Sequence, residues 1–257
     1  MTTWTTEPLG DVLAQIKTGS TPRTSHPEYF NGNIAWFTPS DIGKPKVLVK
    51  ASRTISEDGV RNGAAKLFGK GTVLVTCIGD IGRVGVLSRP SSANQQITAL
   101  TFDERVFPEF AYYWFVANRP KLERFANQAV VPILNNERLQ EVQFSFPADK
   151  REQNRIVELL DKADRLRQTR RYVQQISNTF LASLFLKTFG DITTNPHNWD
   201  TATIGDVVAL SQYGTSEKNN QAKRGYPVLG MSNISYSGTL LPELCTQPAL
   251  RVYASLG

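Results

Sequence analysis

Short apolar runs separated by turn-forming residues fill the first 146 positions of the chain. Three of these runs are rich in β-branched residues and bounded by Gly, Pro, Asp or Ser, which is typical of strands: residues 71–79, 83–88 and 96–102. An aromatic segment, residues 108–124, has a helical pattern that we expect to end near Asn118, because Pro120 follows. The pattern predicts a mixed α/β, mainly β domain.

The pattern changes completely after Pro147, where a long helix is predicted over residues 148–190. Asp149 can cap the first free amides, and Glu152 can reach back to it from three residues later. Neither proline nor glycine occurs again before Gly190, a natural C-terminal stop. A helix of about 40 residues would be roughly 60 Å long.

Apolar residues along this helix alternate at spacings of three and four, which is the seam of a coiled coil rather than of a globular core. The seam is interrupted by Arg170 and Ser177. Because a helix this long cannot bury its seam alone, it needs a partner helix. The expected interface residues are Leu159, Ala163, Leu166, Val173, Phe180 and Leu184.

The chain also repeats itself. Residues 4–21 return as residues 199–216, with Trp4 matched by Trp199, and residues 34–42 return as residues 226–234 after a slip of three. A period this long is not that of a solenoid, whose units hold about 20 to 50 residues. It predicts tandem globular modules, of which the second is incomplete.

Composition is that of an ordinary soluble protein: 257 residues, 40% hydrophobic and 20% charged. We expect a cytoplasmic protein without membrane attachment, because no apolar run is long enough to span a bilayer and the N-terminus lacks the layout of a signal peptide. Cys77 and Cys245 are too far apart in sequence to suggest a disulfide or a metal site, and His26 and His197 are interpreted as loop residues.

The net charge of +6 is concentrated in one segment. Residues 17–89 hold eleven Lys and Arg against five Asp and Glu. Such a segment suits a polyanion such as double-stranded DNA, although a solvated surface explains the charge equally well. The phosphate-contacting candidates are Arg23, Lys44, Lys46, Lys50, Arg53, Arg61 and Lys66.

Base reading requires Arg or Lys for guanine and Asn or Gln for adenine. Arg23 and Arg61 are the better candidates for guanine. Asn94 and Gln95 could read adenine, but a polar cluster that opens a strand more often caps backbone groups. Glycines such as Gly19 are interpreted as scaffold.

We find no catalytic site, cofactor site or metal site in the sequence. Residues 69–72, "GKGT", lack the spacing of a phosphate loop, and residues 79–85, "GDIGRVG", lack that of a dinucleotide fingerprint. No amino-methyltransferase motif and no nuclease Glu-x-Lys tripeptide occurs. The chain is therefore expected not to be an enzyme.

Several segments, taken together and in order, resemble the specificity subunit of type I restriction-modification systems. They are "PLGDV", "KTGSTPR", "IAWFTPSDI", "GDIGRVG", "NQQI", "VVPILNNERLQEVQFSFP" and "REQNRIVELLD". The resemblance implies a first target-recognition domain over residues 1–147, a spacer helix over 148–190 and an incomplete second target-recognition domain over 191–257.

The resemblance also implies a function and partners. Each recognition domain of the family reads half of a bipartite DNA sequence, and two antiparallel helices set the gap between the halves. The helices dock methyltransferase subunits that modify adenine, and the assembly recruits restriction translocase subunits. A specificity subunit directs both activities without catalysis of its own.

The sequence departs from this family pattern at Gly257, before the second recognition domain and its helix are complete. We expect a truncated subunit. Two copies pairing through their helices, or one copy pairing with a separately encoded half, would restore the helix pair. The alternative function is that of an assembly or decoy protein, which binds the methyltransferase through its helix without selective DNA binding.

Overall fold

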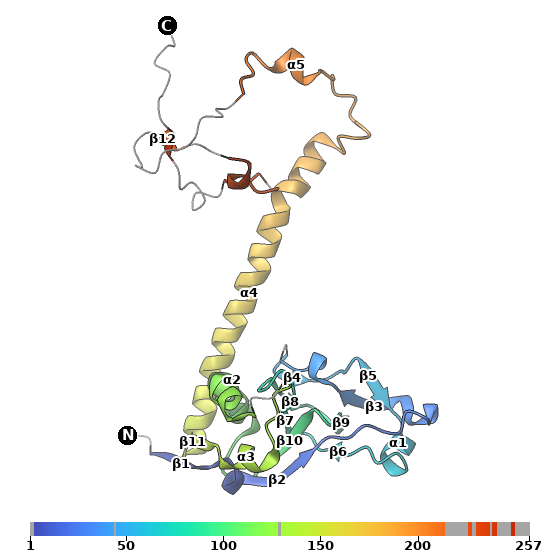
Figure 1. Ribbon diagram of the computed structural model, residues 1–257, viewed down its shortest axis with the longest axis vertical. Coiled ribbons are helices and arrows are strands. Elements are labelled where there is room, and N and C mark those ends of the chain that lie inside the picture. Colours follow the sequence, from blue (N-terminus) through green and yellow to red (C-terminus); the bar gives the residue numbers. More distant parts are fainter. Residues whose placement is uncertain are drawn as a thin grey trace. The chain divides into compact units, whose positions relative to one another are not determined.

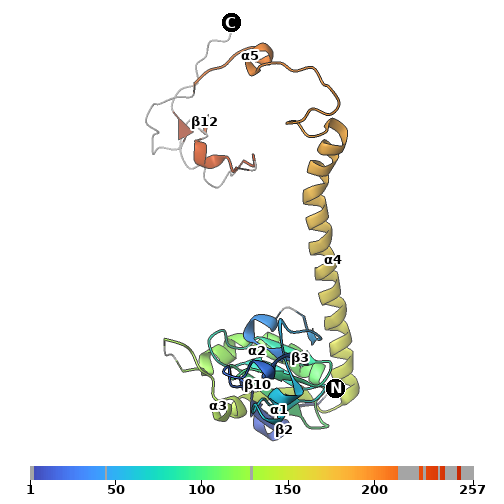
Figure 2. The same cartoon turned by 90° about the vertical axis from the view of Figure 1, so that its right-hand side faces the viewer.

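The computed structural model describes residues 3–43, 45–127, 130–213, 226–227, 230–236, 238–240 and 248–249. It divides into two compact units, Met1–Ala182 and Ser183–Gly257, which we describe separately. The strands of the first unit gather beside the first turns of a long helix (Figure 1; Figure 2). None of the helices in the described residues is long and apolar enough to cross a membrane.

The first unit is built on two β-sheets and a strand pair. The five-stranded sheet has the order β2-β10-β7-β8-β4. Its strands are β2 (Leu13–Thr18), β10 (Ile97–Phe102), β7 (Val73–Thr76), β8 (Val84–Leu87) and β4 (Val47–Leu48). The four-stranded sheet has the order β5-β3-β9-β6. Its strands are β5 (Arg53–Ile55), β3 (Phe30–Phe37), β9 (Ser91–Ala93) and β6 (Leu67–Phe68). Strands β1 (Trp4–Pro8) and β11 (Gln143–Pro147) pair with each other.

The three strands predicted from β-branched runs are confirmed as β7, β8 and β10. Strand β10 is an inner strand and pairs antiparallel with both β2 and β7. Because these strands are covered on both faces, nearly all their side chains are buried, and the sequence reads as continuous apolar runs. The predicted mixed α/β fold class is thus confirmed.

Four α-helices belong to or begin in this unit: α1 (Glu57–Arg61), α2 (Pro108–Phe125), α3 (Asn136–Glu141) and α4 (Lys150–Phe189). Short 3-10 turns add η1 (Leu9–Val12), η2 (Pro27–Tyr29) and η3 (Pro39–Asp41). Helix α2 lies against β7 and β8. The ring of Trp114 on α2 lies 4.8 Å from that of Phe144 on β11. Both rings belong to the largest hydrophobic core of the unit.

The expected end of the aromatic helix at Asn118 is wrong, because α2 continues through Pro120 to Phe125. Proline has no N–H to donate to the carbonyl of Val116, which costs the helix one hydrogen bond. Leu122, beyond the proline, is fully buried in the core. Burial of a leucine stabilises the fold by about 1.5–3 kcal/mol, enough to offset one backbone hydrogen bond lost at the surface.

Helix α4 begins and ends as the sequence predicts. The carboxylate of Asp149 accepts a hydrogen bond from the Arg151 amide at 2.8 Å, as a cap does. The carboxylate of Glu152 does not reach back to Asp149 but lies 3.6 Å from the guanidinium of Arg155. At the other end Gly190 has a φ of +76°, and its amide donates to the Leu186 carbonyl at 2.9 Å. A positive φ favours glycine there and stops the helix.

The second unit contains the last turns of α4, followed by α5 (Ile204–Val207), β12 (Tyr226–Pro227), η4 (Met231–Asn233) and β13 (Pro248–Ala249). Its local structure repeats that of the first unit in two places. In the sequence repeat, helix α5 corresponds to η1, and η4 corresponds to η3. In η3 the Thr38 amide donates to the Asp41 carboxylate, and in η4 the Gly230 amide donates to the Asn233 side chain. That residues 191–257 begin a second recognition domain stays a prediction.

Cys77 follows β7 and is buried, whereas Cys245 lies outside the described residues. Burial raises the pKa of the Cys77 thiol to about 11, so that hardly any thiolate exists near neutral pH. We expect that, in a Cys245→Ser variant, an aromatic disulfide reagent at pH 8 labels Cys77 only after denaturant is added. Rapid labelling without denaturant would show instead that this sheet opens locally.

Candidate nucleic-acid interface

The loop that follows β2 is held against the turn between β9 and β10. The Gly19 amide donates to the Ile97 carbonyl and the Ser20 amide to the Ala93 carbonyl, both at 2.8 Å. A Cβ on Gly19 would lie 2.2 Å from the carbonyl oxygen of Asn94, so only glycine fits. The interpretation of Gly19 as scaffold therefore has a physical reason: two backbone segments approach each other here.

The same loop is tied to the four-stranded sheet by Ser20. Its hydroxyl donates to the Ala64 carbonyl at 2.8 Å and accepts from the Lys66 amide at 3.0 Å. Its carbonyl accepts from the indole of Trp36 on β3 at 3.1 Å. Three segments distant in sequence thus meet at one serine, which fixes the backbone from which nearby cations project.

Five of the predicted phosphate-contacting residues are exposed on the four-stranded sheet or on the loops and helix beside it. We call them the basic edge: Arg23, Lys50, Arg53, Arg61 and Lys66. Lys66 donates to the Thr18 carbonyl at 2.8 Å, and Arg61 pairs with Glu57 at 3.2 Å. Neither contact is buried, so the charges face solvent.

Arg53 of the basic edge is held against two aromatic rings. Its guanidinium lies 4.8 Å from the ring centre of Trp36 and 5.8 Å from that of Phe30. Stacking on aromatic rings occupies the flat face of a guanidinium and leaves its N–H edge free to donate. Such an edge suits a bidentate contact to phosphate or guanine.

Two predicted cations are not part of the basic edge. Lys44 lies outside the described residues. Lys46 forms an ion pair with Asp161 of α4, and its ammonium lies 5.1 Å from the ring centre of Tyr113 on α2. A phosphate contact by Lys46 would have to compete with this ion pair. The structure therefore places Lys46 between the domain and α4.

The two predicted amide readers differ in exposure. Asn94 is 8% exposed, and its side chain bonds the backbone and the side chain of Gln96, at 3.1 and 3.0 Å. This is the capping alternative considered for this polar cluster. Gln95 is exposed, and its side-chain carbonyl accepts from the Thr21 hydroxyl. Of the two, only Gln95 has a side chain that can face a base.

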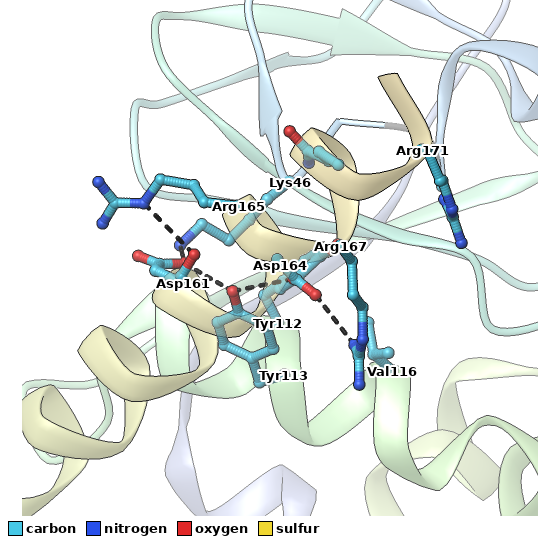
Figure 3. A pocket seen from close by; sticks show the side chains of 11 residues that line it. Lys46, Tyr112, Tyr113, Val116, Asp161, Asp164, Arg165, Arg167 and Arg171 are labelled. Atoms are coloured by element: carbon cyan, nitrogen blue, oxygen red, sulfur yellow. Dashed lines mark hydrogen bonds and ion pairs between the residues drawn. The ribbon is translucent and has the colours of Figure 1, made fainter. Parts of the chain in front are cut away.

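Asp161 is the centre of a polar network that fastens the domain to α4 (Figure 3). Besides Lys46, it accepts a hydrogen bond from the Tyr113 hydroxyl at 2.6 Å, and Asp164 accepts from the same hydroxyl at 3.1 Å. Burial and the two carboxylates raise the pKa of Tyr113. Partial burial disfavours the charged form of Asp161, but hydrogen bonds from Lys46 and Tyr113 outweigh it and lower the pKa.

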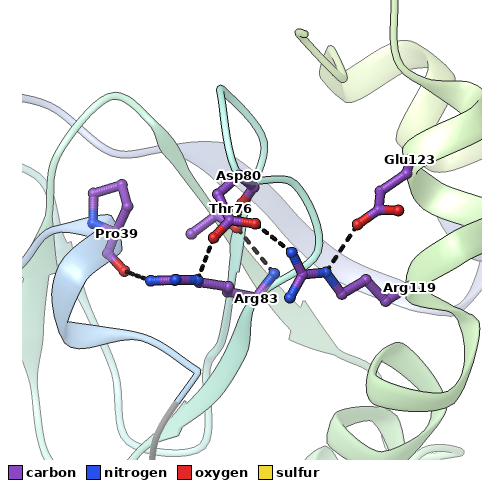
Figure 4. Close-up of polar contacts among 6 residues, drawn as sticks. All are labelled: Pro39, Thr76, Asp80, Arg83, Arg119 and Glu123. Carbon is purple, nitrogen blue, oxygen red and sulfur yellow. Dashed lines mark hydrogen bonds and ion pairs between the residues drawn. The ribbon is translucent and has the colours of Figure 1, made fainter. Parts of the chain in front are cut away.

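A second network removes two more arginines from the basic surface. In the "GDIGRVG" turn, Asp80 pairs with Arg83 at 2.6 Å and also with Arg119 of α2 (Figure 4). Arg83 reaches on to the carbonyl of Pro39 at 3.1 Å, and Arg119 to Glu123 at 3.0 Å. These side chains hold the turn against η3 and α2. Among the described residues of the segment 17–89, the exposed cations outside these networks are those of the basic edge together with Lys17, Lys70 and Arg89.

The described residues contain no group of three or more His, Cys, Asp or Glu side chains that could hold a metal ion. What the geometry offers is a rigid surface with projecting N–H donors. Such a surface can bind phosphates and read base edges.

Comparison with known proteins identifies the family. Residues 1–176 match the family described as type I restriction modification DNA specificity domain. The chain belongs to this specificity family.

A curated specificity subunit is similar in sequence, and two solved structures are similar in fold. The MjaIX type I restriction enzyme specificity subunit of Methanocaldococcus jannaschii is 26% identical over 226 residues, 80% of this chain and 52% of its own. A solved structure from work on the assembly and conformational transition of the type I R-M system matches with a TM-score of 0.58 at 20% identity, over 70% of this chain and 43% of that one. The HsdS subunit of Thermoanaerobacter tengcongensis gives 0.53 at 20% identity, over 66% and 40%. The chain spans about half the length of these specificity-family relatives.

In this member of the specificity family, one buried residue escaped the sequence analysis. Gln153, in the first turn of α4, is fully buried. Its amide nitrogen donates to the carbonyls of Arg105 and Pro147, at 2.8 and 2.9 Å, and its oxygen accepts from the Phe107 amide at 3.0 Å. A glutamine among charged and polar residues is typical of an exposed helix surface. Only its place within the family-like segment "REQNRIVELLD" singles it out.

The predicted interface residues of α4 lie on the helix as expected. Leu159, Leu166, Val173, Phe180 and Leu184 are all between 45% and 72% exposed, and Ala163 is half-buried. A long helix with this much exposed apolar surface is typical of a docking element.

Proposed function

We propose that this chain is the DNA-recognition part of a type I restriction-modification complex and has no catalysis of its own. Membership of the specificity family carries the proposal, and the basic edge supports it. A rigid junction at Ser20 presents exposed cations beside an exposed amide, Gln95. This is the arrangement that sequence-reading proteins use, with charges for phosphates and a few donors for bases.

In this proposal the residues have different roles. Lys50 and Lys66 contact phosphates and fix the register of the duplex. Arg53, held flat by Trp36, and Arg23 or Arg61 donate to guanine or phosphate, while Gln95 is the adenine-reading candidate. Lys46 and Asn94 position other groups, because their side chains are already bonded within the protein.

We propose that the exposed seam of α4 docks a partner helix. In the complex that partner comes from a methyltransferase subunit, a second copy of this chain or a separately encoded second half, and restriction subunits join through the assembly. The competing proposal is an assembly or decoy protein. It shares the seam but has no selective DNA binding.

Methylome sequencing of the source cells with and without the gene tests the proposal. Loss of one methylated adenine motif on deletion is the expected result, and it would reveal the target. An unchanged methylome, together with methyltransferase binding by the purified chain, would instead establish the decoy function.

Salt dependence tests the basic edge. Each phosphate contact contributes about −0.9 to the slope of log affinity against log salt concentration. We expect Lys66→Ala to weaken binding to all duplexes alike and to reduce this slope by about one, as measured by fluorescence anisotropy. Lys121→Ala is the matched control, because Lys121 also donates to a backbone carbonyl, at 3.3 Å, but lies on α2. Equal slopes in the two variants would remove Lys66 from the interface.

A further inference from the structure

The middle of α4 carries positive charge that the basic edge does not include. Four arginines occur in seven residues, from Arg165 to Arg171, and no Asp or Glu follows before Asp191. In the sequence pattern, this stretch is only part of the apolar seam. Its charge therefore needs a separate explanation.

Three of these arginines, Arg165, Arg167 and Arg171, border a cleft of about 540 Å³ between α4 and the domain (Figure 3). Tyr112 and Tyr113 of α2 and Lys46 form one side. Arg165, Gln168 and Arg171 of α4 lie on the other side. All of these residues belong to the first unit.

The acidic groups in the cleft already have partners. Asp161 is bonded to Lys46 and Tyr113, and Asp164 pairs with Arg167 at 3.1 Å. Arg165 donates from Nε to the carbonyl of Asp161 at 3.4 Å, and neither Arg165 nor Arg171 forms an ion pair with any described residue. The cleft thus keeps an excess of two positive charges, because four cations line it against two carboxylates.

Helix geometry separates this face of α4 from the apolar seam. At about 100° per residue, Gln168 and Arg171 lie on the same face as Gln153 and Val157, which are buried against the domain further down the helix. Leu166 and Val173 are each two residues away, about 200° around the helix. A helix docked on the seam would leave the arginine face open.

We propose that Arg165, Gln168 and Arg171 form a binding site for DNA backbone phosphates beside the recognition domain. The inference rests on the proposed function and extends the DNA contact from the domain to α4. The same face continues with Gln175, Asn178 and Thr179, which are exposed and uncharged. Such side chains donate hydrogen bonds to phosphate and sugar oxygens in protein–DNA complexes. A protein partner would need an apolar centre. Between Gln168 and Thr179 this face holds Arg171, Gln175 and Asn178, and the exposed ring of Tyr172 lies at its border.

The test uses the full chain and a labelled 30-base-pair duplex of mixed sequence, so it does not depend on the target. We expect R165Q/R171Q to lower affinity at 0.1 M salt roughly tenfold to a hundredfold and to reduce the salt slope by about two. R165K/R171K should retain the slope, because charge rather than shape is required. R151Q/R155Q removes the same charge near the start of α4, from the face opposite Arg171, and should leave the slope unchanged.

Four results would overturn the inference. A slope for R165Q/R171Q equal to that of the unmodified chain would exclude the site while leaving the proposed function intact. Equal losses in R165Q/R171Q and R151Q/R155Q would show a general charge effect. Unchanged DNA binding with loss of methyltransferase binding would assign the face to a protein. An unmodified chain that binds no duplex would overturn the proposed function as well. Circular dichroism and thermal unfolding confirm that each variant is folded.

Discussion

Replacing Leu166 and Val173 together with glutamate is expected to abolish assembly through α4. The two side chains are 72% and 54% exposed and lie two turns apart on one face of the helix. Burying such side chains against a partner helix is worth about 1.5–3 kcal/mol each, and two buried carboxylates would add a desolvation cost of several kcal/mol. At micromolar concentration the complex should dissociate entirely. Sedimentation velocity, with and without the methyltransferase subunit, measures this directly.

The matched control is Gln175→Glu with Asn178→Glu, which adds the same two charges on the other face of α4. It should leave assembly intact. In both variants the first unit should stay folded, because α4 contributes only Val157 and the partly buried Ile156 to its cores, both far from the substituted positions. A monomeric unmodified chain that also fails to bind methyltransferase would refute the docking proposal.

Arg170 and Ser177 interrupt the seam, and a polar residue at such a position sets the register of a helix pair at some cost in stability.

Elements with a strong local signal could be predicted from the sequence. β7, β8 and β10 are runs of β-branched residues bounded by turns, and α4 has a cap at Asp149 and a stop at Gly190. Helix α2 was predicted to end too early, because the rule that proline ends a helix is local. The burial of Leu122 that carries α2 past Pro120 is a tertiary effect, and only the fold reveals it.

The candidate site was predictable in outline but not in detail. A basic excess is visible in the sequence, yet the cations that stay free depend on the positions of the acids. Asp161 lies 115 residues from Lys46 and nevertheless binds it, and Asp80 occupies Arg83 and Arg119. No separate role was predicted from the sequence for the arginines of α4, because their place over a cleft depends on how α4 packs on the domain.

Gln153→Ala is expected to be the most destabilising single change in the first unit that removes a polar group. The substitution leaves the Phe107 amide and the carbonyls of Arg105 and Pro147 without their partner in a fully buried position. Each unsatisfied buried group costs about 1–3 kcal/mol, although water entering the space relieves part of it. We expect a loss of about 2–4 kcal/mol in the free energy of unfolding, a large part of the 5–15 kcal/mol of a typical domain. Urea unfolding measures it.

Two further variants show whether the hydrogen bonds or the volume of Gln153 matter. Asn154→Ala, at the exposed neighbouring position, should change stability by less than about 0.5 kcal/mol. Gln153→Glu keeps the shape but places a carboxylate oxygen against two carbonyl oxygens, and burial should raise the pKa of the new carboxyl. Because its pKa is higher in the folded than in the unfolded chain, the penalty should be largest at neutral pH and shrink as the pH falls toward the unfolded value of about 4.3. A penalty that does not change with pH would show that the carboxylate escapes to solvent. In that case α4 would not be anchored to the domain by this residue.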